Sequence, residues 1–365
     1  MIATVGRPAL MRWAVPVLGL ALLVSFPLVA SPYLQGLGVI ALLYATVAAS
    51  WDVTLGYAGV FNFGHLAFFG IGAYTAGILT ADAGVEPWLG LVAGAVVAAI
   101  ASVIVYVPVS RLRGIYVALI TFAFAQLVLR FAVSATDLTG GELGLAGVAP
   151  LSIAGVDLVG GSVWSFYLAA GLLVISIIAL RAFVRSDYGI SLLALRDAEA
   201  YAISRGMSVG RSRVLAFVVS ALFTGAAGAI YTYYLQIISP EVLDFSLVTL
   251  VLSMVLLGGA ATLYGPVVAA IILGFADELL APVGPLRFVI VSALVLLTIL
   301  LFPSGMWGGI TRIRDALRRR RTDAHPSLGK DATGSTTAER PPATIDPADG
   351  RSAESSGTTE GGPTP

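Results

Sequence analysis

The stretch VLAFVVSALFTGAAGAIYTYYLQ, residues 214–236, decides the fold class, because it runs for 23 residues without a charged side chain. A helix of roughly 20 apolar residues spans the hydrocarbon core of a bilayer. The whole chain shares this character: 58% of its residues are hydrophobic, 12% are charged, and its mean hydropathy is +0.92. Because soluble domains carry about twice that share of charge, we predict a membrane protein.

Nine further apolar runs flank this stretch, which predicts an all-α fold, a polytopic transmembrane helix bundle of about ten spans. The ten runs are 13–30, 36–55, 64–81, 88–108, 114–133, 163–183, 214–236, 247–262, 264–281 and 286–302. The first run is N-terminal and follows two arginines, as a signal peptide would. Because it is long and is followed by the other nine, we interpret it as a retained anchor.

The charged loops predict that both termini are cytoplasmic, because Lys and Arg are retained in short cytoplasmic loops. With ten spans, the basic clusters at Arg7 and Arg12, at Arg111 and Arg113, at residues 185–213 and at 312–321 all fall on one side. Acidic residues occupy the opposite loops: Asp82, Glu86, Asp137, Glu142, Glu241 and Asp244. Two basic residues disagree with this topology: Arg130 and Arg287.

The domain organisation follows from composition. Residues 1–310 form the predicted transmembrane domain, with a cytoplasmic loop at 184–213. Residues 311–365 begin with a basic stretch and continue as a tail rich in Ser, Thr, Gly, Pro and Asp, which cannot bury a core and is predicted to be disordered. The glycine-rich outer loop 134–162 is too long for a simple turn, so we expect it to fold over the outer mouth.

The reactive side chains are too few for several kinds of chemistry, so we predict no catalytic residue, cofactor or metal. The chain has no cysteine, which excludes disulfides and thiolate metal sites. Its one lysine, Lys330, lies in the tail and not in a P-loop, and of its two histidines only His65 lies among the spans. The acids of the apolar part lie near span ends: Asp52, Asp277 and Glu278. A solute moved uphill would therefore draw its energy from a partner.

The stretch RSDYGISLLALRDAEAYAISRGMSVGRSR, residues 185–213 and here called the arginine island, holds five arginines and three acids between two apolar runs. We predict one short helix over 191–206, ended by Gly206 in the left-handed conformation, with Arg196 and Glu199 three residues apart. Four residues would lie on one side: Leu192, Leu195, Ala202 and Ile203. Scattered charge favours docking into a protein groove over lying on a bilayer; the alternative is that the arginines only fix the topology.

Two glycine-rich segments, LGYAGVFNFGHLAFFGIGAYTAG at 55–77 and LLGGAATLYGPVVAAIILGF at 256–275, each break the chain between two runs. Such breaks are tolerated at membrane depth where they are buried in protein or line a cavity, which favours a solute pathway. The candidate pathway residues are Gly59, Asn62, Gly64, His65, Gly72, Tyr74, Gly258, Gly259, Gly265 and Pro266. The similar positions of the two segments in the two halves are typical of an internal duplication, a two-half pseudo-repeat.

Close helix packing explains the same glycines equally well, since Ala221, Gly225 and Ala229 show small-residue spacing with no function attached. For Asn62 and His65 we favour a structural interpretation over solute contact. Asn62 would cap a helix that begins near Phe63, and His65 would lie in its first turn.

These motifs together resemble the permease subunits of high-affinity branched-chain amino acid ABC importers, of the LivM type. The resemblance covers residues 36–310 and rests on ordered blocks: GYAGVFNFGHLAFFGIGAYTAG, RLRGIYVALITFAFAQLV, LTGGELGL, the arginine island, AFVVSALFTGAAGAIY, ISPEVLDFSLVTLVLSMVLLGGAATLYGPVVAA and FPSGMWG. In FAFAQLV, Gln126 replaces an acid and Ala125 a glycine that are frequent in relatives.

The resemblance implies a core of two permeases, with a LivH-type subunit, driven by two cytoplasmic ATPases and fed by an extracytoplasmic solute-binding protein. The arginine island would be the ATPase-coupling loop, through Leu195, Arg196, Asp197, Glu199, Ala200, Ala202 and Gly206. Its Glu199, Ala200, Ala202 and Gly206 resemble the Glu-Ala-Ala…Gly motif of importers, with Tyr201 in place of the second alanine and one extra residue before Gly206.

The expected function is therefore a permease subunit in the cytoplasmic membrane of a prokaryote, which moves leucine, isoleucine, valine or a similar small zwitterionic solute without touching ATP. A urea or amide importer permease is the nearest alternative. A stand-alone channel or ion-coupled carrier is the alternative from another class, and an intramembrane hydrolase would have only His65 as a histidine base.

Overall fold

The structure is a computed structural model that describes residues 23–153, 155–280, 283–284, 286 and 293. The described chain is mainly helical, as the apolar runs predict. Five helices are long and apolar enough to cross a membrane: Pro32–Tyr57, Pro87–Val109, Ile115–Ser134, Val163–Arg185 and Val209–Leu235. Three shorter apolar helices accompany them: His65–Ala81, Phe245–Gly258 and Tyr264–Asp277. The protein is thus a helical, multi-pass membrane protein.

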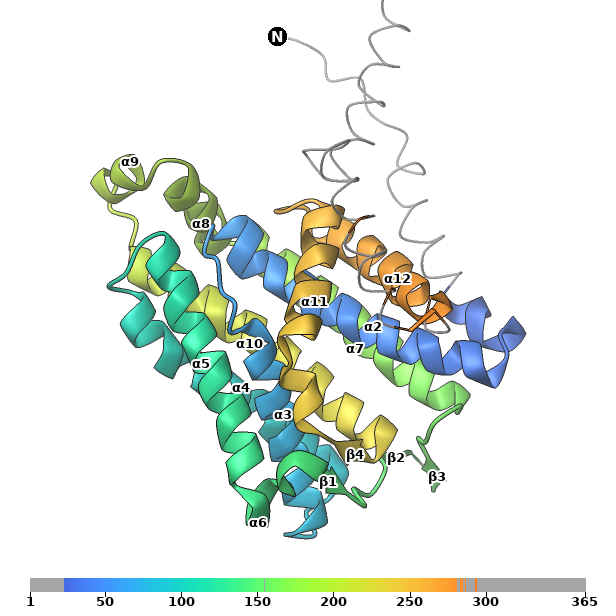
Figure 1. Ribbon diagram of the computed structural model, residues 1–365. Helices are drawn as coiled ribbons and strands as arrows, with labels where there is room; N and C mark the ends of the chain where they lie inside the picture. The colour runs from blue at the N-terminus through green and yellow to red at the C-terminus, as the bar shows by residue number, and fades with distance from the viewer. Residues whose placement is uncertain (1–22, 154, 281–282, 285, 287–292, 294–365) are drawn as a thin grey trace, which may run out of the picture. The chain divides into compact units, whose positions relative to one another are not determined.

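The long helices and the shorter apolar helices together form the frame of the described fold (Figure 1). In chain order they are α2 (Pro32–Asp52, continued by a π-helical turn at Val53–Tyr57), α3 (His65–Ala81), α4 (Pro87–Val109), α5 (Ile115–Ser134), α7 (Val163–Arg185), α10 (Val209–Leu235), α11 (Phe245–Gly258) and α12 (Tyr264–Leu279). Eight of the predicted runs coincide with these helices. Two other predicted parts, the run 286–302 and the tail 311–365, lie almost wholly outside the described residues. The run 13–30 is described only from residue 23, and its residues 23–29 are helical.

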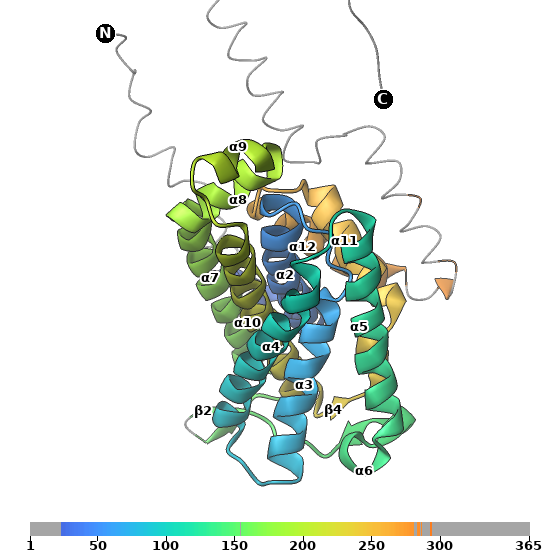
Figure 2. The same cartoon turned by 90° about the vertical axis from the view of Figure 1, so that its left-hand side faces the viewer.

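Short elements join the long helices. They are α6 (Thr136–Thr139), a 3₁₀ turn (Gly141–Leu143), β1 (Leu145–Ala146), β2 (Ser152–Ile153), β3 (Val156–Asp157), α8 (Asp187–Asp197), α9 (Glu199–Ser204), β4 (Ile237–Ile238) and a 3₁₀ turn (Pro240–Leu243). β1 pairs antiparallel with β4, and β2 with β3. Figure 2 shows α8 and α9 at one end of the long helices and α6 with the strands at the other end. We call these the island end and the strand end.

Small residues set the packing of the core. α10 packs against α3 and α4, while α2 packs against α7 and α12. A Cβ on Gly72 of α3 would overlap the carbonyl of Gly225 in α10, and a Cβ on Gly225 would overlap Ala98 of α4. The backbones of these three helices therefore approach closely, as the small-residue spacing around Gly225 predicts.

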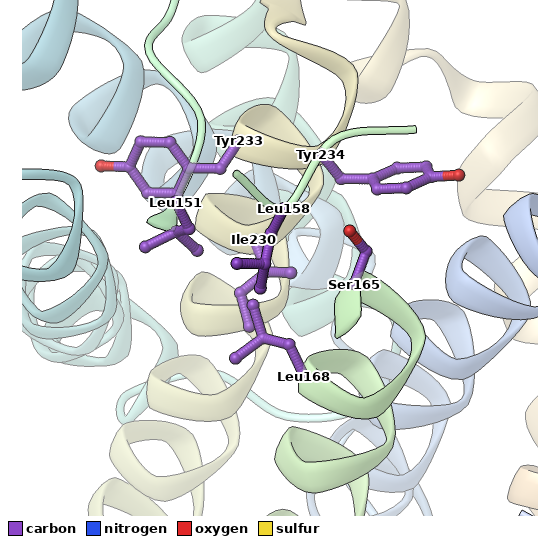
Figure 3. Close-up of a pocket in the computed structure, with 7 residues that line it drawn as sticks. All are labelled: Leu151, Leu158, Ser165, Leu168, Ile230, Tyr233 and Tyr234. Carbon is purple, nitrogen blue, oxygen red and sulfur yellow. The ribbon is translucent and has the colours of Figure 1, made fainter. Parts of the chain in front are cut away.

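The loop 134–162 packs against α4, α7 and α10; that it covers an outer mouth stays a prediction. Its Leu151 and Leu158 are buried, and the indole N–H of Trp88 in α4 donates to the carbonyl of Ser152 at 3.0 Å. Both leucines line a cavity of about 10 Å³ together with residues of α7 and α10, which Figure 3 draws as sticks. A cavity of this size has room for about one water molecule, so it is a packing defect rather than a solute site.

Candidate coupling site

The arginine island forms two helices, α8 and α9, and not the single helix over 191–206 that the sequence predicts. The chain turns at Ala198, whose φ of −150° and ψ of 73° lie outside the helical region. Gly189 allows α8 to begin directly after α7, because a Cβ there would overlap the backbone of Val184. The charged segment is thus folded tightly against the ends of the long helices.

The end of α9 follows the prediction. Gly206 is left-handed, with a φ of 82°. Its N–H donates to the carbonyl of Ile203 at 2.9 Å, and the N–H of Met207 donates to that of Ala202 at 3.1 Å. This pattern satisfies the last carbonyls of the helix, so glycine is needed here for backbone reasons.

Burial divides the island into an inner and an outer face. Leu192, Leu195 and Ala202 are at most 1% exposed, as predicted for the packed side, whereas Ile203 is 47% exposed and was wrongly placed there. The outer face carries large apolar side chains: Tyr188, Ile190, Tyr201 and Ile203. Exposed apolar side chains in a charged segment outside the long helices are typical of an interaction surface.

Glu199 joins the island to two neighbouring segments. Its carboxylate lies 3.4 Å from Arg113, in the loop between α4 and α5, and 3.5 Å from Arg213 of α10. Arg196, three residues before Glu199, pairs with Asp197 instead, on the other side of the turn at Ala198. Glu199 therefore links the island to the α4–α5 loop and to α10, and is itself engaged within the chain.

Arg196 reaches in the other direction, to the first glycine-rich segment. One guanidinium nitrogen, Nη1, donates to the carbonyl of Gly56 at 2.6 Å, and Nε donates to Asp197 at 2.8 Å. Gly59 has a φ of 67°, and a Cβ there would lie 2.6 Å from Cγ of Arg196. The arginine thus packs along the π-helical turn that ends α2. π-helical turns occur frequently at functional sites.

Asp52 extends this connection to the second glycine-rich segment, and sequence reasoning missed it. Its buried carboxylate accepts hydrogen bonds from the backbone N–H groups of Ala261 at 2.7 Å, Thr262 at 3.1 Å and Leu263 at 2.9 Å. A Cβ on Gly56 would overlap Asp52, so this glycine makes room for the carboxylate. A single acid at the end of an apolar run, just before a glycine break, was the signal available in the sequence.

The loop that Asp52 holds joins α11 to α12 and has an unusual backbone. Ala261 and Leu263 have φ values of 61° and 60°, a region that non-glycine residues rarely adopt. Successive N–H groups in such a conformation form a concave anion site, which the carboxylate of Asp52 occupies. Strained backbone of this kind persists only where surrounding contacts hold it. Asp52 supplies those contacts from α2.

A further contact ties α7 to the start of α12. Arg181 donates to the hydroxyl of Tyr264, and its guanidinium carbon lies 5.6 Å from the centroid of the same ring. Four segments therefore meet at the island end: α8, the π-helical turn after α2, the α11–α12 loop, and the end of α7. The two glycine-rich segments, predicted separately, contact each other here.

The predicted pathway residues near α3 fit the structural interpretation. His65 is fully buried, stacks on Trp51 with ring centroids 5.2 Å apart, and its Nε2 lies 2.8 Å from the hydroxyl of Thr224 in α10. α3 begins at His65 and not near Phe63, and its N-cap Gly64 makes no side-chain capping bond. Asn62 instead accepts a hydrogen bond from the N–H of Gly64 at 3.0 Å, which shapes the turn ahead of the helix.

The other predicted pathway residues are mostly packing positions in the described chain. Gly258 of α11 and Gly265 of α12 face each other so closely that a Cβ on either would overlap the other's backbone. All ten candidates except Gly59 are buried, including Gly259, Pro266 and Tyr74. Their role in a pathway remains a prediction.

Comparison with known proteins places this arrangement in a family. The family described as "Branched-chain amino acid transport system / permease component" matches residues 33–302. The LivM permease protein of the high-affinity branched-chain amino acid transport system of Escherichia coli K12 is 28% identical over 79% of this chain and 73% of its own length. The LivH permease protein of Salmonella typhimurium is 25% identical over 73% of this chain and 91% of its own length. No solved structure matches the chain.

Proposed function

Because the chain belongs to the family of permease components of branched-chain amino acid transport systems, we propose that it imports leucine, isoleucine, valine or a similar small zwitterionic solute across a prokaryotic cytoplasmic membrane. It is a transport subunit of a multi-subunit ABC system and not an enzyme. The proposed partners are a LivH-type permease, two cytoplasmic ATPases and an extracytoplasmic solute-binding protein.

The outer face of the island is the proposed docking surface for the ATPase. Of the predicted coupling residues, Leu195 and Ala202 are buried and Glu199 pairs within the chain, so these three would support the surface rather than form it. Asp197, Ala200 and Gly206 are exposed beside the apolar outer face. The large apolar side chains Tyr201, 66% exposed, and Ile203 would be the main anchors of an ATPase groove.

The observation that carries the proposal is the chain of contacts from the island into the bundle. Arg196 of α8 binds the carbonyl of Gly56, and Asp52, four residues before Gly56, binds the α11–α12 loop. A displacement of α8 by the ATPase would therefore be transmitted to both glycine-rich breaks. This suits a transporter whose energy comes from outside the membrane.

The test compares how much ATPase co-purifies with the tagged wild-type chain and with the tagged double variant Tyr201→Ser, Ile203→Ser. We expect the variant to insert in the membrane and to lose most of the captured ATPase, because its side chains point away from the core. Leu143→Ser is the matched control, since Leu143 is 88% exposed near the strand end. Equal ATPase capture by all three proteins would contradict docking at the island.

A further inference from the structure

An open hollow of ≈ 720 Å³ lies beside α5, away from the coupling site. Ile71 of α3 contributes to it, together with residues of the second half of α5: Gln126, Leu127, Arg130, Phe131 and Ser134. None of the ten predicted pathway residues lines this hollow. Pockets that bind small molecules have about this volume, and most are apolar with a few polar groups.

Arg130 is the polar group that most requires an explanation. It disagrees with the topology that accounts for the other basic clusters, so orientation in the membrane does not explain it. Its side chain is exposed and forms no hydrogen bond or ion pair with any residue that the structure describes. A charged side chain in an apolar helix is costly and usually marks a ligand or a partner.

Gln126 shows that this polarity continues into the span. It lies one helical turn before Arg130, about 6 Å deeper along the axis, and Ser134 follows one turn beyond. Its amide also makes no hydrogen bond to another residue in the described part of the chain. Arg130 lies four residues before the end of α5, within reach of lipid headgroups, but contact with headgroups alone needs no amide one turn deeper. A polar stripe with apolar neighbours favours a solute with one charged end.

We propose that this hollow binds the carboxylate of a zwitterionic amino acid, with Arg130 as the cationic partner and Gln126 as a second donor. Arginine binds carboxylates through two parallel hydrogen bonds. Leu127 and Phe131, which line the same hollow, would contact the aliphatic side chain of the solute. The site is open on one side, where the second permease would provide the facing wall. This inference rests on the proposed import of amino acids.

The absence of cysteine allows a direct binding test. Leu127→Cys places a thiol in the hollow, and the complete complex in vesicles is treated with a charged thiol reagent. Labelling of this chain is followed by mass. We expect leucine to slow labelling several-fold and leucinamide, which lacks the carboxylate, to leave it unchanged. Leu119→Cys is the matched control, because Leu119 is 57% exposed on the same helix outside the hollow.

Substitutions of Arg130 then identify the contact. In the Leu127→Cys background, Arg130→Gln should abolish protection by leucine, and Arg130→Lys should retain part of it. Equal protection by leucinamide, or protection that survives Arg130→Gln, would overturn the inference. Labelling that responds to anionic phosphatidylglycerol but not to leucine would also overturn it, because Arg130 would then bind only lipid phosphate.

ATP-driven uptake of leucine by the same vesicles separates this inference from the proposed function. Uptake without protection at residue 127 overturns the carboxylate site alone. Absence of uptake of any branched-chain amino acid by the wild-type complex overturns the proposed function itself.

Discussion

At the scale of single residues, Asp52 is the side chain that joins the end of α2 to the α11–α12 loop. Its carboxylate satisfies three backbone N–H groups of a loop with two non-glycine residues at positive φ. A buried carboxylate is costly unless it is fully hydrogen-bonded, and here both oxygens accept. The acid and the loop therefore stabilise each other.

Asp52→Ala should lower the free energy of unfolding by about 2–3 kcal/mol, because it removes the charged acceptor of three backbone N–H groups. The stability of Asp52→Asn should fall between that of Asp52→Ala and that of the wild type, because the amide oxygen still accepts a hydrogen bond whereas the amide nitrogen presents a donor to a backbone N–H group. Asp244→Ala is a matched control: Asp244 is exposed and caps α11 through the N–H of Ser246 at 2.7 Å, a bond worth about 1 kcal/mol. Thermal unfolding in detergent measures all three, and equal losses for Asp52→Ala and Asp244→Ala would refute the role of Asp52.

At the scale of elements, hydrophobic periodicity and length predict the helices, because the cost of exposing backbone to lipid leaves few other structures. The end of α9 at Gly206 was predictable for a similarly local reason. The division of the island at Ala198 was not, since nothing in the sequence between Arg196 and Glu199 requires a turn. The contacts of Glu199, Arg196 and Asp52 are with residues distant in sequence, so a single sequence gives no signal for them.

The α11–α12 hairpin provides a test of glycine as a packing residue. Gly258→Ala should destabilise the protein by about 1–3 kcal/mol, because the new methyl group overlaps the backbone at Gly265 and rigid backbone cannot move aside. Gly171→Ala in α7 is the control, since nothing lies within 4 Å of a Cβ built there. The control should be neutral or stabilising, because alanine favours helix. Denaturation midpoints of the two variants would show no difference if the Gly258 contact were unimportant.

At the scale of the whole molecule, the two proposed tasks, coupling to an ATPase and binding of a solute, lie at different positions along the helices. The island end holds the contacts that would receive motion from an ATPase, and the hollow beside α5 lies in the half of that helix toward α6 and the strand end. The few ionisable residues among the spans predict that the energy for transport comes from a partner, whereas the contacts of Arg196 and Asp52 depend on packing between helices and cannot be predicted from a single sequence. Coupling should therefore be separable from docking by mutation.

Arg196→Ala makes that separation. The substitution removes the bond to the carbonyl of Gly56 but leaves the outer face of the island unchanged, so ATPase capture should remain near the wild-type amount. Solute uptake per ATP hydrolysed should fall about tenfold or more, because a loss of roughly 1.4 kcal/mol in coupling already changes an equilibrium tenfold.

Arg211→Ala is the control, since it removes an exposed island arginine of the same charge whose side chain makes no contact with Gly56. Uptake and ATP hydrolysis are measured on one preparation of vesicles. If Arg196→Ala and Arg211→Ala kept the same ratio of uptake to hydrolysis, the contact with Gly56 would not carry the coupling, and motion would have to reach the bundle through Glu199 and α10 instead.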